Sequence, residues 1–240
     1  MKLIVFTILC FSICISSFDL KPQKKQTEKK FDSPPKGIEN YVFGYNDLLS
    51  SLLWVRVLQD IEICDQKRKT DGPKNFDPNK DRLTQVLNRK LHEPKCEQGW
   101  VYKMLDVITD LTPDFYMAYS AGGNFLSVLV DDRQGASNIH KKGLMYFPNN
   151  WQLLYQAGYH ELFEMQNPEE SALLLRRAAK AGAPTWVYSL SAKLYSEVGQ
   201  ALFAKTILES VLEKKPNSQG IDRVKSRLDE INRILRENAQ

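Results

Sequence analysis

The residues best suited to chemistry are His160, Glu161 and Glu164, in the run HELFE, together with a distant His140. A zinc protease needs two histidines one helical turn apart with a glutamate between them, because that spacing puts both imidazoles on one side of the metal. Here Glu164 stands where the second histidine would be. The chain also has no nucleophile motif, no phosphate-binding glycine loop and no CxxC pair. The sequence therefore predicts a non-catalytic protein with no cofactor and no metal site.

Two of the four cysteines fall in an apolar leader, and the other two, Cys64 and Cys96, flank a long insertion. Cys64 closes one expected helix and Cys96 immediately precedes the next. If those helices are antiparallel neighbours, an oxidising compartment would join the two thiols in a disulfide. The alternative is a pair of unrelated buried thiols in a cytoplasmic protein.

Basic pairs occur at three comparable places: Lys141-Lys142, Arg176-Arg177 and Lys214-Lys215. The simplest interpretation is that they are solvated charges on the outer faces of helices. A basic ridge that contacts an acidic partner or lipid headgroups is the alternative.

A pattern of small residues and prolines repeats three times along the second half of the chain. Its three occurrences are Ala136, Gly143 and Pro148, then Ala172, Ala179 and Pro184, then Ala204, Val211 and Pro216. Small residues one heptad apart let a neighbouring helix approach closely, and the proline ends each helix. The pattern predicts stacked helical units of 36 and then 32 residues.

This pattern resembles the tetratricopeptide repeat (TPR) family, in which each unit of about 34 residues is a pair of antiparallel helices. The third unit fits best, and the resemblance covers residues 113–216 as three repeats. Its matching residues are Tyr188, Ala192, Tyr195, Gly199, Ala204, Leu208, Val211 and Pro216. The resemblance implies an all-α fold, a TPR-like α-solenoid in which antiparallel helix pairs form a right-handed superhelix.

The family resemblance also implies a function. Such proteins bind a protein or peptide on a concave face built mainly from the first helix of each pair. By register, that face would include the partner-binding residues Phe125, Glu161, Glu164, Trp186, Ser189 and Lys193. The run FGYNDLLSSLLWVRVLQD further resembles the opening helix of bacterial exported TPR proteins.

The repeats are flanked by helical segments on both sides. Residues 39–112 are expected to form a divergent first unit, with helices at 41–64 and 98–111 and an insertion at 67–97. The first of these helices carries more than one apolar stripe, which predicts burial on two sides. Residues 217–240 carry one apolar stripe and are expected to form a capping helix, with a coiled-coil strand as the alternative.

The N-terminus suggests export. Residues 1–18 form a short apolar run of secretory type, with an uncleaved membrane anchor or a lipid-modified cysteine as alternatives. Residues 19–38 are expected to be a flexible Lys-rich tether. Because lysines beside a membrane oppose export, the cytoplasmic face of a membrane is the alternative to a periplasmic or membrane-tethered location.

Charge argues against nucleic-acid binding. Residues 1–36 hold seven lysines and three acidic residues, which leaves 26 basic and 26 acidic residues of the totals of 33 and 29. A nucleic-acid-binding solenoid would carry net positive charge on its folded part. The sequence thus predicts an exported or membrane-tethered scaffold that binds a protein or peptide. The competing prediction is a structural subunit of a cell-envelope complex.

Overall fold

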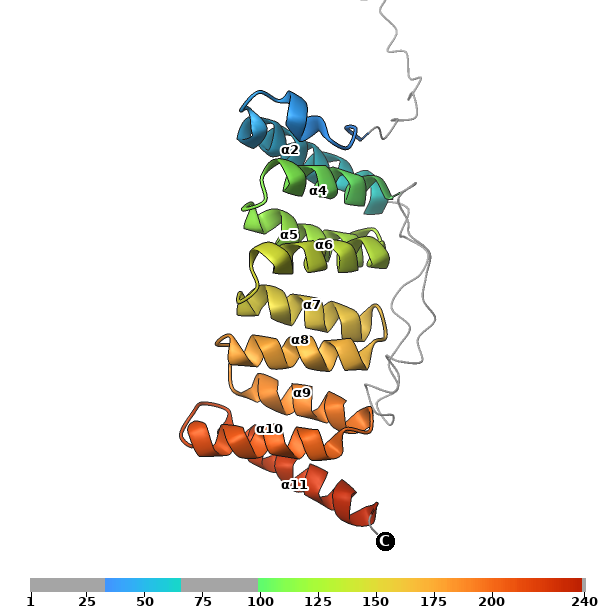
Figure 1. Ribbon diagram of the computed structural model, residues 1–240. Coiled ribbons are helices and arrows are strands. Elements are labelled where there is room, and N and C mark those ends of the chain that lie inside the picture. The colour runs from blue at the N-terminus through green and yellow to red at the C-terminus, as the bar shows by residue number, and fades with distance from the viewer. Residues whose placement is uncertain (1–32, 66–98, 239–240) are drawn as a thin grey trace, which may run out of the picture. The chain divides into compact units, whose positions relative to one another are not determined.

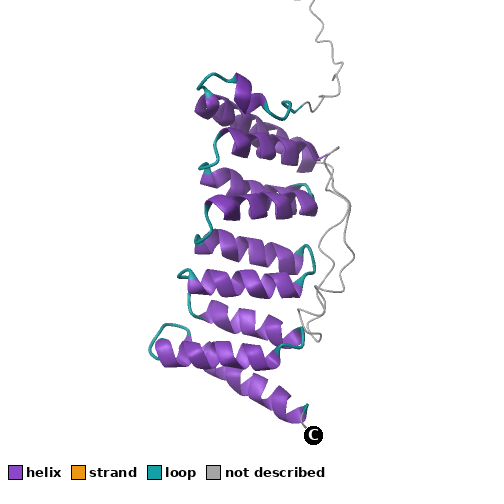
Figure 2. Ribbon diagram, in the orientation of Figure 1, coloured by secondary structure: helices purple, strands orange, loops and turns teal. Residues whose placement is uncertain are grey.

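The computed structural model describes residues 33–65 and 99–238, and within these ranges every regular element is helical (Figures 1 and 2). In chain order the elements are η1 (Ile38–Tyr41), α2 (Asn46–Asp65), α4 (Trp100–Leu111), α5 (Tyr116–Asn124), the π-helical turn η4 (Phe125–Leu129), α6 (Arg133–Tyr146), α7 (Trp151–Phe163), α8 (Pro168–Lys180), α9 (Trp186–Glu197), α10 (Ala201–Lys214) and α11 (Ile221–Glu237). The leader, most of the tether and the 67–97 insertion lie outside the described residues.

Neighbouring helices pack against one another in chain order, as Figure 1 shows from α4 to α11. Contacts also form between alternate helices: α5 with α7, α9 with α11, and α4 with α6. A ring contact between Tyr155 and Trp186 also joins α7 to α9. These contacts link α5, α7, α9 and α11, which we call the first layer. We call α6, α8 and α10, which alternate with them along the chain, the second layer. The predicted all-α fold of sequentially packed helices is confirmed.

The helices end and begin where the local sequence favours it. Asn150 caps α7 by accepting a hydrogen bond from the Leu153 backbone N–H at 2.9 Å, and Asn167 caps α8 in the same way. Side-chain caps satisfy backbone donors that a helix leaves unpaired at its start. Pro148, Pro184 and Pro216 each follow a helix by a few residues. These signals mark the starts of α7 and α8 and the ends of α6, α8 and α10.

The repeated small residues are buried between helices. Ala136, Ala172, Ala179 and Ala204 are fully buried, and Val211 is nearly so. Gly143 is in close contact with α5: a Cβ built there would lie 2.8 Å from the Tyr119 Cβ atom. Since real Cβ contacts are never so short, the α5–α6 packing requires glycine at this position.

The two ends of the helical array differ in how they are covered. In α11 the apolar stripe is packed, with Ile221, Val224 and Ile231 buried. This helix contacts both α9 and α10, and its assignment as a capping helix stays a prediction.

Helix α2 buries only one side. Leu53 and Val57 are buried, whereas Leu48 and Leu52 are 58% and 59% exposed. The expectation that this helix is buried on two sides is therefore wrong for the described residues. Its second apolar stripe faces away from α4 and leaves an exposed apolar surface at this end.

Candidate functional site: an aromatic row over a buried polar network

Three aromatic side chains form a row along α7. Tyr155, Tyr159 and Phe163 are spaced four residues apart, so they lie on one face of the helix. The rings of Tyr159 and Phe163 stack with centroids 4.2 Å apart, and those of Tyr155 and Tyr159 are 6.4 Å apart. Tyr159 is 50% exposed, and its two neighbours are half-buried. The row is a partly exposed surface held in place by ring contacts.

Trp186 extends this row onto α9. Its ring meets that of Tyr155 edge-on, with centroids 5.9 Å apart. The guanidinium of Arg223, from α11, lies 6.0 Å from the centre of the Trp186 ring. Ser189 lies one turn further along α9, where its hydroxyl donates to the Arg223 carbonyl at 3.1 Å. Three first-layer helices therefore meet around one tryptophan. We call Tyr155, Tyr159, Phe163 and Trp186 the aromatic row.

Lys193 continues α9 beyond Ser189. Its ammonium lies 3.6 Å from the Glu197 carboxylate, in a pair one helical turn apart. Both side chains are partly exposed, so the pair contributes little to stability. Ser189, in contrast, is buried and satisfied within the fold. Of the residues expected on α9, Trp186 and Lys193 reach solvent and Ser189 supports α11.

Phe125 lies in a second aromatic cluster. Its ring stacks on Trp54 of α2, with centroids 5.9 Å apart and an interplanar angle of 19°. Trp54 also meets Phe115 edge-on at 5.5 Å. These contacts join α2 to the π-helical turn η4. No described ring contact connects this cluster to the aromatic row.

The side chains of Glu161 and Glu164 do not lie on the exposed side of α7, which we call its open face. Glu161 is 4% exposed and accepts a hydrogen bond from the Ser137 hydroxyl at 2.6 Å. Glu164 accepts one from the Arg133 Nε at 3.3 Å. Both carboxylates thus bind α6, and the open face of α7 carries Tyr155 and Tyr159.

Gly158 indicates only part of this register. It lies against α8, where an added Cβ would be 3.0 Å from the Leu175 Cγ. Because the residue that permits close approach faces the neighbouring helix, Tyr159, the next residue along, faces away from α8. Tyr155 and Glu161 lie three positions on either side of Gly158, so counting from this glycine does not distinguish their faces.

His160 is fully engaged within the fold. Its Nε2 lies 3.0 Å from the Arg133 carbonyl oxygen, which can only accept, so Nε2 carries the proton. The Nδ1 atom is then an acceptor, and the Ser127 hydroxyl donates to it at 2.6 Å. Burial lowers the pKa of His160 and keeps it neutral. With both ring nitrogens used and both side chains buried, the Ser127–His160 pair serves to fix the π-helical turn against α7.

His140 lies beside His160, with ring centroids 5.5 Å apart. Its ring packs on Gly123, where an added Cβ would be 2.4 Å from Cε1. Within the described part of the chain, neither ring nitrogen of His140 has a hydrogen-bond partner. Burial and the neighbouring His160 lower the pKa of His140 to about 3. A neutral imidazole is therefore buried here, between Gly123 and His160.

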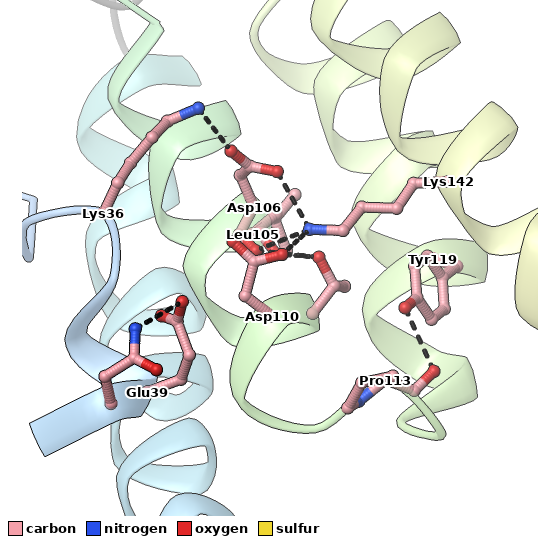
Figure 3. A network of polar contacts seen from close by, with 10 residues as sticks. Lys36, Glu39, Leu105, Asp106, Asp110, Pro113, Tyr119 and Lys142 are labelled. Atoms are coloured by element: carbon pink, nitrogen blue, oxygen red, sulfur yellow. Dashed lines mark hydrogen bonds and ion pairs between the residues drawn. The ribbon is translucent and has the colours of Figure 1, made fainter. Parts of the chain in front are cut away.

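A second polar network ties α6 to α4 (Figure 3). The Lys142 ammonium lies 2.9 Å from one Asp106 carboxylate oxygen and 2.5 Å from Asp110. Lys36 reaches the other Asp106 oxygen at 3.0 Å. Burial would raise the pKa of Asp106, but hydrogen bonds from the two lysines outweigh it and lower that pKa. Lys142, expected as a solvated charge, is instead a structural contact.

Among residues 33–65 and 99–238, no group of three or more potential ligands is placed to hold a metal ion. None of the described helices is long and apolar enough to cross a membrane. The expected Cys64–Cys96 disulfide depends on positions outside the described side chains and stays a prediction. In comparisons with known proteins, no protein-family model and no curated protein matches the chain.

Proposed function

We propose that this chain is a non-catalytic scaffold of the TPR-like α-solenoid type, which binds a protein or peptide partner along the first-layer helices. The observation that carries the proposal is the aromatic row, a set of partly exposed rings that crosses from α7 to α9. Tyrosine and tryptophan are the residues most often found at the energetic centres of protein interfaces. Rings already held by stacking lose little side-chain freedom on binding, which favours affinity.

The remainder of the proposal comes from the sequence. The repeated small residues and prolines support the TPR-like assignment, and the apolar leader supports an exported, periplasmic or membrane-tethered location. Lys193, two turns beyond Trp186 on α9, is partly exposed and forms an ion pair with Glu197, so the pair offers both a positive and a negative group to a partner.

A photo-crosslinking experiment tests the partner-binding face. A photoreactive phenylalanine analogue replaces Tyr159 in the full chain, expressed in the cells that make it. The matched control carries the same analogue at Met145, which is 72% exposed on α6 of the second layer. We expect a discrete cross-linked product from position 159 and none from position 145.

The same product should disappear when Lys193→Ala and Trp186→Ala are added, because interface anchors typically contribute about 2 kcal/mol or more each. Circular dichroism should show unchanged helical content in that variant. Cross-linking that is equal at positions 145 and 159 would exclude the aromatic row as the binding face.

An assembly subunit of an envelope complex is the second candidate, and the exposed apolar side of α2 favours it. Leu48, Leu52 and Val55 are all substantially exposed on this helix. A stable subunit interface at this end would survive extraction at high salt, since apolar contacts are not screened. Co-purification at high salt that Leu48→Lys with Leu52→Lys abolishes would favour the subunit over the peptide binder.

A further inference from the structure

A cavity of about 360 Å³ opens between α8, α9 and α10. Ligand pockets typically measure about 300–1,000 Å³, so this one has room for a small molecule. Its charged lining comes from Arg176 and Lys180 of α8, and from Lys214 and Lys215 of α10 and its C-cap. Thr206 and Ser210 of α10 add hydroxyl groups. The aromatic row lies on other residues of the chain, so this cavity is separate from the proposed partner-binding site.

The lining is basic and contains no acidic residue. Within the described ranges, the ion pairs of α9 and α10 use Lys193 and Lys205, and none involves the four cations of the cavity. Four positive charges around one small volume repel one another, at a cost that an opposite charge would remove. The cavity therefore favours an anion that carries more than one charge.

Arg176 is held in position for such an anion. Its guanidinium lies 5.1 Å from the centre of the Phe203 ring and 5.9 Å from that of Tyr195. These ring contacts restrain the side chain, and Arg176 is among the residues that line the cavity. Its Nε is buried and has no hydrogen-bond partner among the described residues. A buried donor without a partner destabilises a protein, and an anionic oxygen would satisfy it.

The other side of the cavity is arranged similarly. The Lys215 ammonium lies 5.9 Å from the centre of the Tyr188 ring. Burial raises the pKa of Tyr188, so its phenol remains protonated at neutral pH. The Ser210 hydroxyl adds a further polar group to the lining. Guanidinium, ammonium and hydroxyl groups together are the usual ligands of phosphate oxygens.

We propose that this cavity binds a small compound bearing more than one phosphate group. Residues of two of the basic pairs, which were expected to be solvated charges, thus line this cavity. Arg176 and Lys214, 38 positions apart, converge on one volume because α8 and α10 both pack against α9.

Calorimetric titration of the full chain with sodium tripolyphosphate tests the proposal. We expect saturable binding of one tripolyphosphate per chain at physiological salt. Lys180→Gln with Lys214→Gln should weaken this binding by about a hundredfold, because each of the two lost charge-assisted contacts contributes on the order of 1.4 kcal/mol, a factor of ten. Both lysines are exposed, so the variant should keep its fold.

The matched control is Lys141→Gln with Lys225→Gln, which removes two exposed lysines away from the cavity. Its affinity should stay within about twofold of the parent, since distant exposed charges are screened. Equal weakening in both variants, or heat that never saturates, would show only general attraction to positive charge and overturn the proposal. Citrate that binds as tightly as tripolyphosphate would overturn the assignment to phosphate.

Vesicles distinguish the two sources of clustered phosphates. The chain is mixed with phosphatidylcholine vesicles that contain phosphatidylinositol bisphosphate, and tripolyphosphate is then added. Release of the chain from the vesicles would identify a lipid headgroup as the bound group. Tripolyphosphate binding without any recovery on vesicles would identify a soluble compound.

Discussion

Acidification from neutral pH to about pH 4.5 should lower the free energy of unfolding by roughly 2–3 kcal/mol through His140 alone. Burial holds the pKa of His140 at about 3 in the folded chain, against 6.5 for an unperturbed histidine. Between these two values the unfolded state binds a proton that the folded state does not. Stability therefore falls as the pH drops below about 6.5 and continues to fall until about pH 3. His160, whose pKa is also lowered, acts in the same direction.

The substitution His140→Leu should remove most of this pH dependence. Leucine is similar in volume and cannot take up a proton, so the change should alter stability at pH 7 by less than about 1.5 kcal/mol. Urea unfolding followed by circular dichroism, at pH 7 and near pH 4.5, measures both quantities. We expect the variant to be more stable than the parent at the lower pH.

Carboxylates provide the internal control. The pKa of Asp106 is lowered in the folded chain, so its contribution disappears only below about pH 4, near the ordinary value for aspartate. A parent protein whose stability is flat between pH 7 and about pH 5 would contradict a buried neutral His140. The same conclusion would follow if His140→Leu left the slope unchanged.

The repeat pattern was sufficient to predict the all-helical fold. Ala136, Ala172 and Ala204 mark equivalent places in three helices, and each is buried as close packing requires. Small side chains at regular spacing indicate places where neighbouring helices pack closely, so the spacing of these alanines predicts how the helices repeat. The pattern does not determine the twist between successive pairs, because that depends on contacts along the whole interface.

The repeat pattern did not predict which side chains lie on the open face of α7. Glu161 has the charge of a surface residue, but it lies inside because Ser137 satisfies its carboxylate. Tyr159 has a large aromatic side chain of the kind that is common in protein cores, but it is 50% exposed. Polarity predicts burial only when the partner of a polar group is known, and that partner lies 24 positions away.

The cavity between α8 and α10 was also beyond sequence reasoning. Its basic residues come from segments some 35 positions apart, and only the packing of both helices on α9 brings them together. No sequence pattern predicts that the buried Nε of Arg176 lacks a hydrogen-bond partner among the described residues. Helix α2 illustrates the opposite error: two apolar stripes predicted burial on two sides, whereas the side that carries Leu48 and Leu52 is exposed.

Replacing Gly143 by alanine should destabilise the chain by about 1–3 kcal/mol, the usual cost of overpacking. The added methyl group would lie 2.8 Å from both the Cβ and the Cγ of Tyr119. That tyrosine cannot move away easily, because it is fully buried and its hydroxyl donates to the Pro113 carbonyl at 3.0 Å (Figure 3). The alanine's better helix propensity would return at most about 1 kcal/mol.

The control for this substitution is Lys141→Ala, at an exposed position of the same helix. It should change stability by no more than about 0.5 kcal/mol. For a chain of this size each kcal/mol lowers the melting temperature by roughly 2–4 °C, so thermal unfolding followed by circular dichroism separates the two variants. Equal melting temperatures would mean that α5 and α6 can move apart at no cost. The close contact at Gly143 would then not be what sets the spacing of the repeated helices.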